Sequence, residues 1–166
     1  SVNFRSGSLR RVKAEVPPFA LLTLHRPSNV DDPGALRRIF AALRTLGRQI
    51  LIVFPVHPRT LARMEELGVR LGAPPRQRPG LRMVGPLGYL DFLHLQKRAA
   101  LVLTDSGGIQ EETSILGVPC LTLRDNTERP ITIARGTNRL VGSDTRRIVA
   151  AARRVLRRPP PRRRSR

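Results

Sequence analysis

The chain has 166 residues, 40% of them hydrophobic, which is enough for one domain with its own core, and it offers no apolar run that could span a membrane. Neither a signal peptide nor a disulfide framework is indicated, since Cys120 is the single cysteine, so we expect a cytoplasmic protein with this thiol buried in the core. The net charge of +19 is weighted towards an arginine-rich tail without aromatic side chains, which favours non-specific attraction to polyanions and disfavours specific recognition of nucleic acid.

Composition shifts divide the chain into three parts. Residues 1–18 are predicted to be a basic leader or linker, residues 19–157 a folded domain, and residues 158–166 a disordered tail of proline and arginine. Within the domain, hydrophobic periodicity predicts strands at 20–24, 50–54, 81–84, 101–103, 119–123 and 140–141. It predicts helices at 33–46, 60–67, 89–98, 109–116 and 145–156, with a helical turn at 131–135 and a loop at 25–30.

Several helix ends carry clear sequence signals. Asp32 can cap the helix at 33–46, Pro33 suits its first position, and Gly47 follows its last apolar residue. Gly117 is expected to end the helix at 109–116. In the helix at 89–98, His94 is expected to be partly buried.

Strands and helices alternate along the whole domain, which predicts an α/β fold with a parallel sheet and helices on both faces. In such sheets, ligands bind at the carboxyl ends of the strands. Loops with polar side chains follow four of the predicted strands at that edge, namely His25-Arg26, His57, Ser106-Gly107-Gly108 and Glu128-Arg129. The sequence therefore predicts a site at this edge of the sheet.

The stretch from 101 to 112 is the strongest single indication of function. A short apolar strand is followed by Asp105-Ser106-Gly107-Gly108 and then by a helix, an arrangement that presents free backbone N–H groups to an anion. The glycines lack the Cβ atoms that would keep a phosphate away from the backbone, and Glu112 lies near enough along the helix to reach a sugar hydroxyl. The pattern indicates a diphosphate site with a carboxylate for a ribose. The alternative is a strand-to-helix turn in which the two glycines serve only tight packing.

Four motifs, at residues 24–26, 55–58, 104–112 and 123–130, resemble the carboxyl-terminal domain of the non-hydrolysing UDP-N-acetylglucosamine 2-epimerases. They read Leu-His-Arg, Pro-Val-His-Pro, Thr-Asp-Ser-Gly-Gly-Ile-Gln-Glu-Glu and Leu-Arg-Asp-Asn-Thr-Glu-Arg-Pro, and the resemblance covers about residues 19–156. It implies a Rossmann-like, UDP-binding domain that forms one half of the two-domain arrangement called GT-B. It also implies conversion of UDP-N-acetylglucosamine (UDP-GlcNAc) to UDP-N-acetylmannosamine by anti elimination and re-addition of UDP, without a cofactor, in the biosynthesis of cell-surface polysaccharides.

The resemblance implies a set of UDP-binding residues, namely His25, Leu87, Phe92, Ser106, Gly107, Gly108, Glu112 and Arg129. Residues 106–108 would hold the diphosphate, Glu112 the ribose, and Phe92 the uracil ring, whose edge the backbone near Leu87 would contact. His25 and Arg129 would approach the phosphates, which makes His25 the candidate catalytic residue. Arg26 and His57 match positions that contact a second, activating UDP-sugar in some members. The histidines are spaced too widely, without nearby acids in a ligand pattern, to indicate a metal site.

The acid and base carboxylates of the family lie in an amino-terminal catalytic domain, and the leader at 1–18 is too short to supply one. We therefore expect this chain to bind UDP or a UDP-N-acetylhexosamine and to be inactive without that domain as a partner. Two alternatives stay open: a UDP-sugar binding module without turnover, and the nucleotide half of a GT-B glycosyltransferase. Without the resemblance, Phe92 would be read as a core residue and His57 as part of an ordinary loop. The face that would meet the other domain could also support a homodimer.

Overall fold

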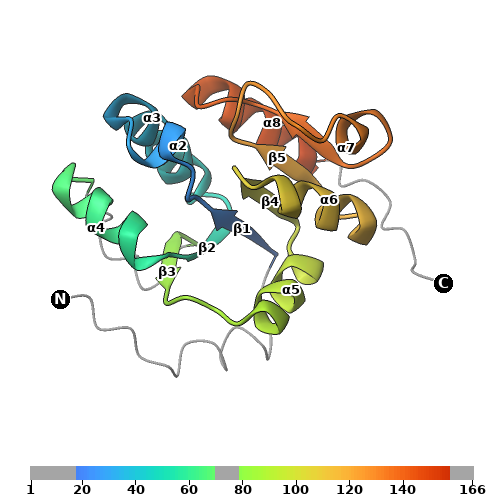
Figure 1. The fold of residues 1–166 in the computed structure, drawn as a ribbon, viewed down its shortest axis with the longest axis horizontal. Coiled ribbons are helices and arrows are strands. Elements are labelled where there is room, and N and C mark those ends of the chain that lie inside the picture. Colours follow the sequence, from blue (N-terminus) through green and yellow to red (C-terminus); the bar gives the residue numbers. More distant parts are fainter. Residues whose placement is uncertain (1–17, 70–78, 158–166) are drawn as a thin grey trace.

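Parallel strands form the centre of the fold. The computed structural model describes residues 18–69 and 79–157. Its strands are β1 (Phe19–Thr23), β2 (Leu51–Pro55), β3 (Leu81–Val84), β4 (Leu101–Thr104), β5 (Cys120–Thr122) and β6 (Asn138–Leu140). In the described part of the chain they make one six-stranded sheet in the order β3-β2-β1-β4-β5-β6, and every neighbouring pair is parallel (Figure 1). The predicted leader, apart from its last residue, and the predicted tail lie outside the described residues.

Helices lie on both faces of the sheet, so the predicted Rossmann-like α/β fold is confirmed. Their bounds are α2 (Pro27–Val30), α3 (Pro33–Leu46), α4 (Pro58–Glu66), α5 (Tyr89–Arg98), α6 (Gly107–Leu116), α7 (Ile131–Ala134) and α8 (Thr145–Arg157). Helices α3 and α8 pack together over one face, and α5 and α6 lie over the other (Figure 1). The sheet order reverses direction after β1, so β1 and β4 are neighbours although many residues separate them in the sequence.

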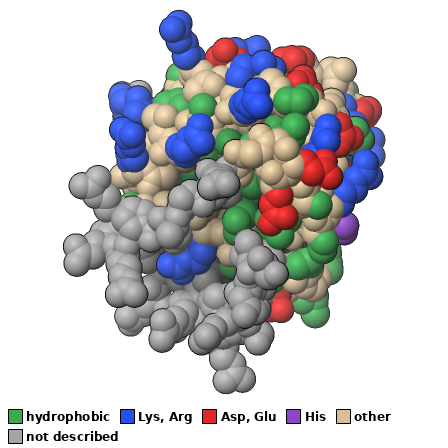
Figure 2. Space-filling model, turned by 90° about the vertical axis from the view of Figure 1, so that its left-hand side faces the viewer, with side chains coloured by type: hydrophobic (Ala, Val, Ile, Leu, Met, Phe, Trp, Pro, Cys, Tyr) green, Lys and Arg blue, Asp and Glu red, His purple; other side chains and the backbone are tan. Residues whose placement is uncertain are grey.

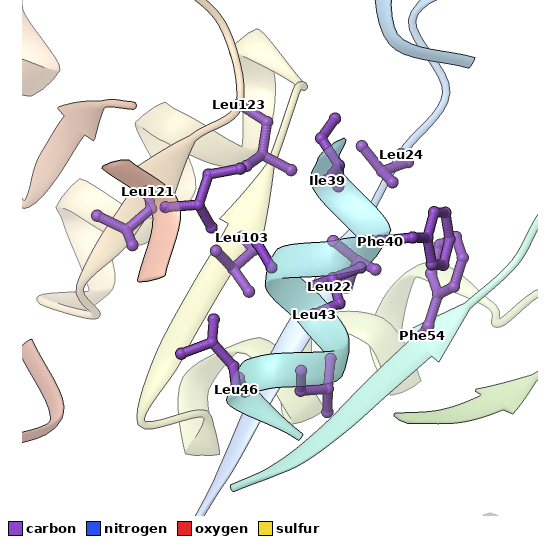
Figure 3. Close-up of a cluster of buried hydrophobic side chains, with 14 of the residues drawn as sticks. Leu22, Leu24, Ile39, Phe40, Leu43, Leu46, Phe54, Leu103, Leu121 and Leu123 are labelled. Atoms are coloured by element: carbon purple, nitrogen blue, oxygen red, sulfur yellow. The ribbon is translucent and has the colours of Figure 1, made fainter. Parts of the chain in front are cut away.

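Alternate side chains of each central strand enter two separate apolar clusters, because successive residues of a strand point to opposite faces. Leu22 and Leu103 belong to the larger cluster, which contains the inner face of α3 (Figure 3). The rings of Phe40 and Phe54 meet within it, with centroids 6.3 Å apart. Leu21 and Val102, one residue earlier on each strand, belong to the second cluster under α5 and α6.

Near the sheet edge, the structure corrects the predictions for α2, α4 and α6, and α4 begins at Pro58 and not at 60. Residues 27–30, predicted as part of a loop, form the short helix α2, whose four residues are too few to show a helical period. Helix α6 begins at Gly107 and not at 109, so both glycines lie in its first turn. The predicted end at Gly117 is confirmed, because this residue has a φ of 68° in the left-handed region.

Two expectations for single side chains have opposite outcomes. Cys120 is buried as predicted, and this burial raises the pKa of its thiol to about 11, so the thiol stays protonated. His94 was predicted to be partly buried and this is wrong, because the inward face of α5 carries Leu95 and Gln96 and turns His94 to the surface.

Candidate functional site

Three loops that the sequence analysis selected lie at the carboxyl ends of adjacent strands. β1 leads to His25, β4 to Ser106, and β5 to the loop that ends at Arg129, and these strands are neighbours in the order β1-β4-β5. The hydroxyls of Thr23 and Thr104, at the last positions of β1 and β4, lie 2.7 Å apart and join the first two loops at their base. The topology therefore brings residues from three distant segments to one edge of the sheet, where parallel α/β folds bind ligands.

The N-terminus of α6 presents backbone N–H groups that the protein itself does not use. Ser106 is the N-cap residue, but its side chain makes no capping hydrogen bond. Its own N–H donates to the Thr104 hydroxyl at 3.0 Å, which fixes the turn. Within the described residues, the N–H groups of Gly107, Gly108 and Ile109 have no protein acceptor, as expected for the first turn of an uncapped helix. Such a terminus is suited to an anion.

The space in front of these amides distinguishes between the two explanations of the glycine pair. A Cβ built at Gly107 would meet nothing within 4 Å, and one built at Gly108 would meet only the Ser106 hydroxyl, at 4.0 Å. Neither glycine has a positive φ, so neither is required by its backbone conformation. Tight packing and unusual dihedral angles are therefore both excluded as the reason for glycine here. Both observations are compatible with close approach by a molecule outside the domain.

A buried carboxylate links the loop after β1 to the end of β4. Asp105 is fully buried and accepts hydrogen bonds from the backbone N–H groups of His25 and Arg26 and from the Asn29 amide. The imidazole Nδ1 of His25 lies 3.0 Å from Asp105 Oδ1, while 56% of the His25 side chain is exposed at the edge. Sequence reasoning missed the part that Asp105 and Asn29 play, because 80 residues separate Asp105 from its histidine partner.

The contact between His25 and Asp105 favours the charged form of both side chains. The pKa of His25 is raised above 6.5, mainly by its hydrogen bond to Asp105. Burial of Asp105 acts to raise its own pKa, but hydrogen bonds from the His25 ring and from the backbone outweigh burial, so this pKa lies below 3.8. The contact with Asp105 therefore favours the protonated, cationic form of His25, at the same edge of the sheet as the backbone amides of α6.

The loop between β5 and α7 holds Arg129 beside α6. Arg129 Nε lies 2.9 Å from a carboxylate oxygen of Glu111, the residue before Glu112. The Thr127 hydroxyl donates to the buried amide oxygen of Gln110 at 2.6 Å, which ties the loop to the same helix. At the start of the loop, Arg124 donates two hydrogen bonds to Glu128 and holds the pKa of that carboxyl down, at about 2. The loop is thus fixed by contacts at its beginning, middle and end.

The remaining predicted UDP-binding residues occupy two places. Glu112 is half-buried, and within the described part of the chain its carboxylate accepts no hydrogen bond and forms no ion pair. Leu87 and Phe92 are partly buried against the second apolar cluster. Ile109, in the first turn of α6, packs against the same cluster, so the Phe92 ring and the free amides belong to one face of the sheet. The structure therefore gives Phe92 a packing role and leaves the residue only partly buried.

The two residues predicted to contact a second UDP-sugar already have protein partners. His57 is the N-cap of α4, where its Nδ1 accepts a hydrogen bond from the Arg59 N–H at 3.2 Å. Arg26 lies 3.6 Å from Glu128. His57 follows β2 and Arg26 follows β1, and these strands are neighbours in the sheet. That the two residues contact one ligand stays a prediction.

The surface of the described residues carries both charged and large apolar side chains. Figure 2 shows lysine and arginine side chains interleaved with acidic and apolar ones on one face of the molecule. Large apolar side chains are exposed on α5 and α6, with Leu90 at 79% and Ile115 at 82%.

Among the helices of the described ranges, none is long and apolar enough to cross a bilayer. Nor do the described histidine, cysteine and acidic residues form a group of three or more that could hold a metal ion.

Comparison with known proteins identifies the family. The sequence profile of the UDP-N-acetylglucosamine 2-epimerases matches residues 3–166. The chain belongs to this family. It is similar to the UDP-N-acetylglucosamine 2-epimerase of Methanocaldococcus jannaschii, with 44% identity over 133 residues that make up 79% of this chain and 36% of that protein. It is also similar to the UDP-2,3-diacetamido-2,3-dideoxy-D-glucuronate 2-epimerase of Pseudomonas aeruginosa, with 42% identity over 126 residues, or 75% of this chain and 33% of that protein.

Solved structures of family members have the same fold. The UDP-GlcNAc 2-epimerase of M. jannaschii superposes with a TM-score of 0.80 and 37% identity over 95% of this chain and 45% of that one. A structure of the same enzyme in complex with UDP-GlcNAc and UDP gives a TM-score of 0.79 and 41% identity over 92% of this chain and 42% of that one. The chain thus corresponds to less than half of these solved epimerases, and to about a third of the relatives compared by sequence.

Proposed function

We propose that this chain forms the UDP-binding half of a UDP-GlcNAc 2-epimerase with a GT-B arrangement. The observation that carries the proposal is the open glycine turn of α6, because neither packing nor backbone conformation explains Gly107 and Gly108, and a closely approaching diphosphate does. Family membership supports UDP as the nucleotide. A further support is that the M. jannaschii relative was crystallised with UDP-GlcNAc and UDP.

Each predicted side chain then has a role that its position supports. The α6 amides and the Ser106 hydroxyl bind the diphosphate, and Glu112 accepts hydrogen bonds from the ribose hydroxyls. Arg129, held next to α6 by Glu111, and His25, held by Asp105, supply positive charge near the phosphates. The Phe92 ring lies against the uracil, with the backbone near Leu87 at its edge.

The chemistry of this proposal is an anti elimination of UDP followed by its re-addition. Removal of the C2 proton and departure of UDP place negative charge on the diphosphate, which the amides and cations described above stabilise. The acid and base carboxylates for the sugar would come from the part of the relatives that has no counterpart in this sequence. This chain alone would then bind the nucleotide without turnover. The expected role in polysaccharide biosynthesis in the cytoplasm belongs to the same proposal.

Titration with UDP tests the binding site. We expect Glu112→Gln to raise the Kd for UDP about tenfold to a hundredfold, because charge-assisted hydrogen bonds to the ribose are each worth about 1.5–3 kcal/mol. Glu65→Gln is the matched control, since it neutralises an exposed helical glutamate on α4, which follows a different strand. Calorimetry measures both. Equal affinities of Glu112→Gln and the parent chain would remove the ribose role, and no binding at millimolar UDP would overturn the proposed function.

Proton exchange tests the absence of turnover. UDP-GlcNAc incubated with the chain in heavy water should keep its C2 proton, as followed by NMR. Exchange at C2, or formation of the manno epimer, would show that this chain carries its own acid and base, and would contradict the assignment of these groups to another domain. A stable chain that binds UDP and does not exchange the proton would also fit a binding module, which differs only in having no catalytic partner.

Two further expectations stay within the proposal. Arg26 and His57 would contact a second UDP-sugar, and a double variant at these positions should then leave the first UDP site unchanged while it removes a second binding event. The exposed apolar side chains of α5 and α6 would support association, either with a catalytic domain or as a homodimer. Sedimentation of the chain across concentrations measures the homodimer directly.

A further inference from the structure

The hydrogen bonds around Asp105 determine where the proton of His25 lies. The two oxygens of this buried carboxylate are surrounded by donors: the N–H groups of His25 and Arg26, the Asn29 amide and the His25 ring. Since an ionised carboxylate can only accept, the ring atom that faces it, Nδ1, must carry a proton. The other ring nitrogen, Nε2, has no protein partner within the described residues, and the ring is half-exposed at the edge of the sheet.

We propose that Asp105 acts as a positioning residue that couples nucleotide binding to protonation of His25. With Nδ1–H held by Asp105, Nε2 is the atom available to the diphosphate, and it can donate a hydrogen bond only when it also carries a proton. Binding of the diphosphate therefore favours the imidazolium, and the imidazolium favours binding. This inference rests on the proposed function for the location of the diphosphate, and it goes beyond it by assigning a task to a residue outside the contact set.

The charged groups around His25 support a protonated ring. Asp105 is the group in direct contact, and its hydrogen bond is the largest influence on the pKa of His25, which lies above 6.5. Arg26 acts in the opposite direction, but it lies 3.6 Å from Glu128, which offsets part of its charge. Arg124 shares this carboxylate through two hydrogen bonds, so Glu128 offsets only part of the charge of the two arginines. A bound diphosphate would add negative charge on the open side and raise the pKa of His25 further.

A purely structural role for Asp105 predicts something different. The carboxylate also fixes the turn into α2 through the Arg26 N–H and Asn29, so its loss could destabilise the chain whatever His25 does. The state of the ring must therefore be measured directly, in the unaltered chain, and independently of stability. His57 provides an internal comparison, because its Nδ1 accepts a hydrogen bond from Arg59 and its neutral form must carry the proton on Nε2.

Nitrogen NMR of the full chain without ligand tests the first half of the inference. We expect neutral His25 to be the Nδ1–H tautomer and neutral His57 the Nε2–H tautomer, and we expect the His25 ring to titrate above pH 6.5. Asp105→Asn, which removes the charge, should lower the pH at which His25 titrates. A neutral His25 with its proton on Nε2, or a titration of His25 at or below pH 6.5, would overturn the inference.

Calorimetry with UDP-GlcNAc tests the second half, because this diester, unlike UDP, has no phosphate group that titrates near neutral pH. Titrations in two buffers with different ionisation enthalpies should show proton uptake on binding at pH values above the titration of free His25. Affinity should be constant below that pH, then fall by up to tenfold per pH unit, and level off once the bound form has titrated. His25→Gln, which leaves Asp105 and its other donors in place, should bind more weakly and show neither proton uptake nor this pH dependence.

The outcomes separate the two proposals. Binding of UDP-GlcNAc by the parent chain without proton uptake would overturn the coupling and leave the proposed function intact. No binding at any pH would remove both, while the tautomer of His25 in the free chain would still report on Asp105 alone. Proton uptake that persists in His25→Gln would assign the titrating group elsewhere and would also overturn the coupling.

Discussion

The first backbone N–H groups of α3 and of α6 have no acceptor within their own helix, and the two helix ends differ in whether a side chain accepts from them. In α3, Pro33 has no N–H, and the Asp32 side chain accepts from the N–H groups of Gly34 and Ala35 at 2.8 and 3.1 Å, so the protein satisfies its own donors. In α6, the first three N–H groups have no acceptor within the described residues, although Ser106 is a residue type that commonly caps helices. Helix α6 thus leaves free the backbone donors that an anion would need, whereas α3 uses its own.

The glycine pair offers the largest test of this contrast. Replacing Gly107 and Gly108 together by alanine should weaken UDP binding about thirtyfold, or ~2 kcal/mol, because the methyl groups would occupy the space in front of the amides. The fold should be unaffected or slightly stabilised, since alanine is the better helix former. Gly34→Ala is the control for affinity alone, because Gly34 occupies in α3 the position that Gly108 occupies in α6, but a Cβ there would lie 3.1 Å from Arg38 and 3.2 Å from Asp32 side-chain atoms. Calorimetry and urea unfolding give the two readouts.

A result in which the alanine pair binds UDP like the parent chain would contradict the idea that these glycines admit a ligand. A loss of stability without a change in affinity would return them to a packing role, which the free space around both positions argues against. Weaker UDP binding in Gly34→Ala would show that the effect is not specific to α6.

Removal of each capping residue gives the next largest effect. Asp32→Ala should lower the free energy of unfolding by about 1 kcal/mol, because two backbone donors lose their acceptor. Ser106→Ala should change it by less than about 0.5 kcal/mol, because the Ser106 side chain makes no capping bond, and should instead weaken UDP binding. Urea unfolding of the two variants checks the stability part. Equal destabilisation would mean that both helix ends are capped alike and that the comparison fails.

The sequence predicted most of this architecture, and the exceptions have physical causes. Helix α3 was predicted within its observed bounds, because its apolar spacing and its cap are encoded locally. The start of α6 was misplaced by two residues, since Gly-Gly is typical of a turn and only the structure shows helical backbone there. Helix α2 was missed, because its support comes from Asp105, which lies far away in the sequence and hydrogen-bonds the Arg26 N–H and Asn29.

The candidate site shows the same division between local and distant information. Ser106, Gly107 and Glu112 were predicted from one continuous motif that lies within a strand and the helix after it. The contact between the His25 ring and the Asp105 carboxylate depends on β1 and β4 being neighbours in the sheet. The alternation of strands and helices in the sequence does not determine this strand order. The signal that could have found it is positional, since each residue follows the end of its strand by one or two positions.

The smallest expected effect is the pH dependence of stability. It should come from His25, whose ring contacts Asp105 just before α6. Because the pKa of His25 is raised in the folded chain, its stabilising contribution is complete below pH 6.5 and is lost as the pH rises through the folded value. The parent chain should therefore lose stability as the pH rises above 6.5, and His25→Gln should lose less. The ring is half-exposed, so solvent screening keeps the difference small. Urea midpoints measure it, with His94→Gln as the control. An unchanged slope in His25→Gln would show that the Asp105 pair contributes nothing to folding.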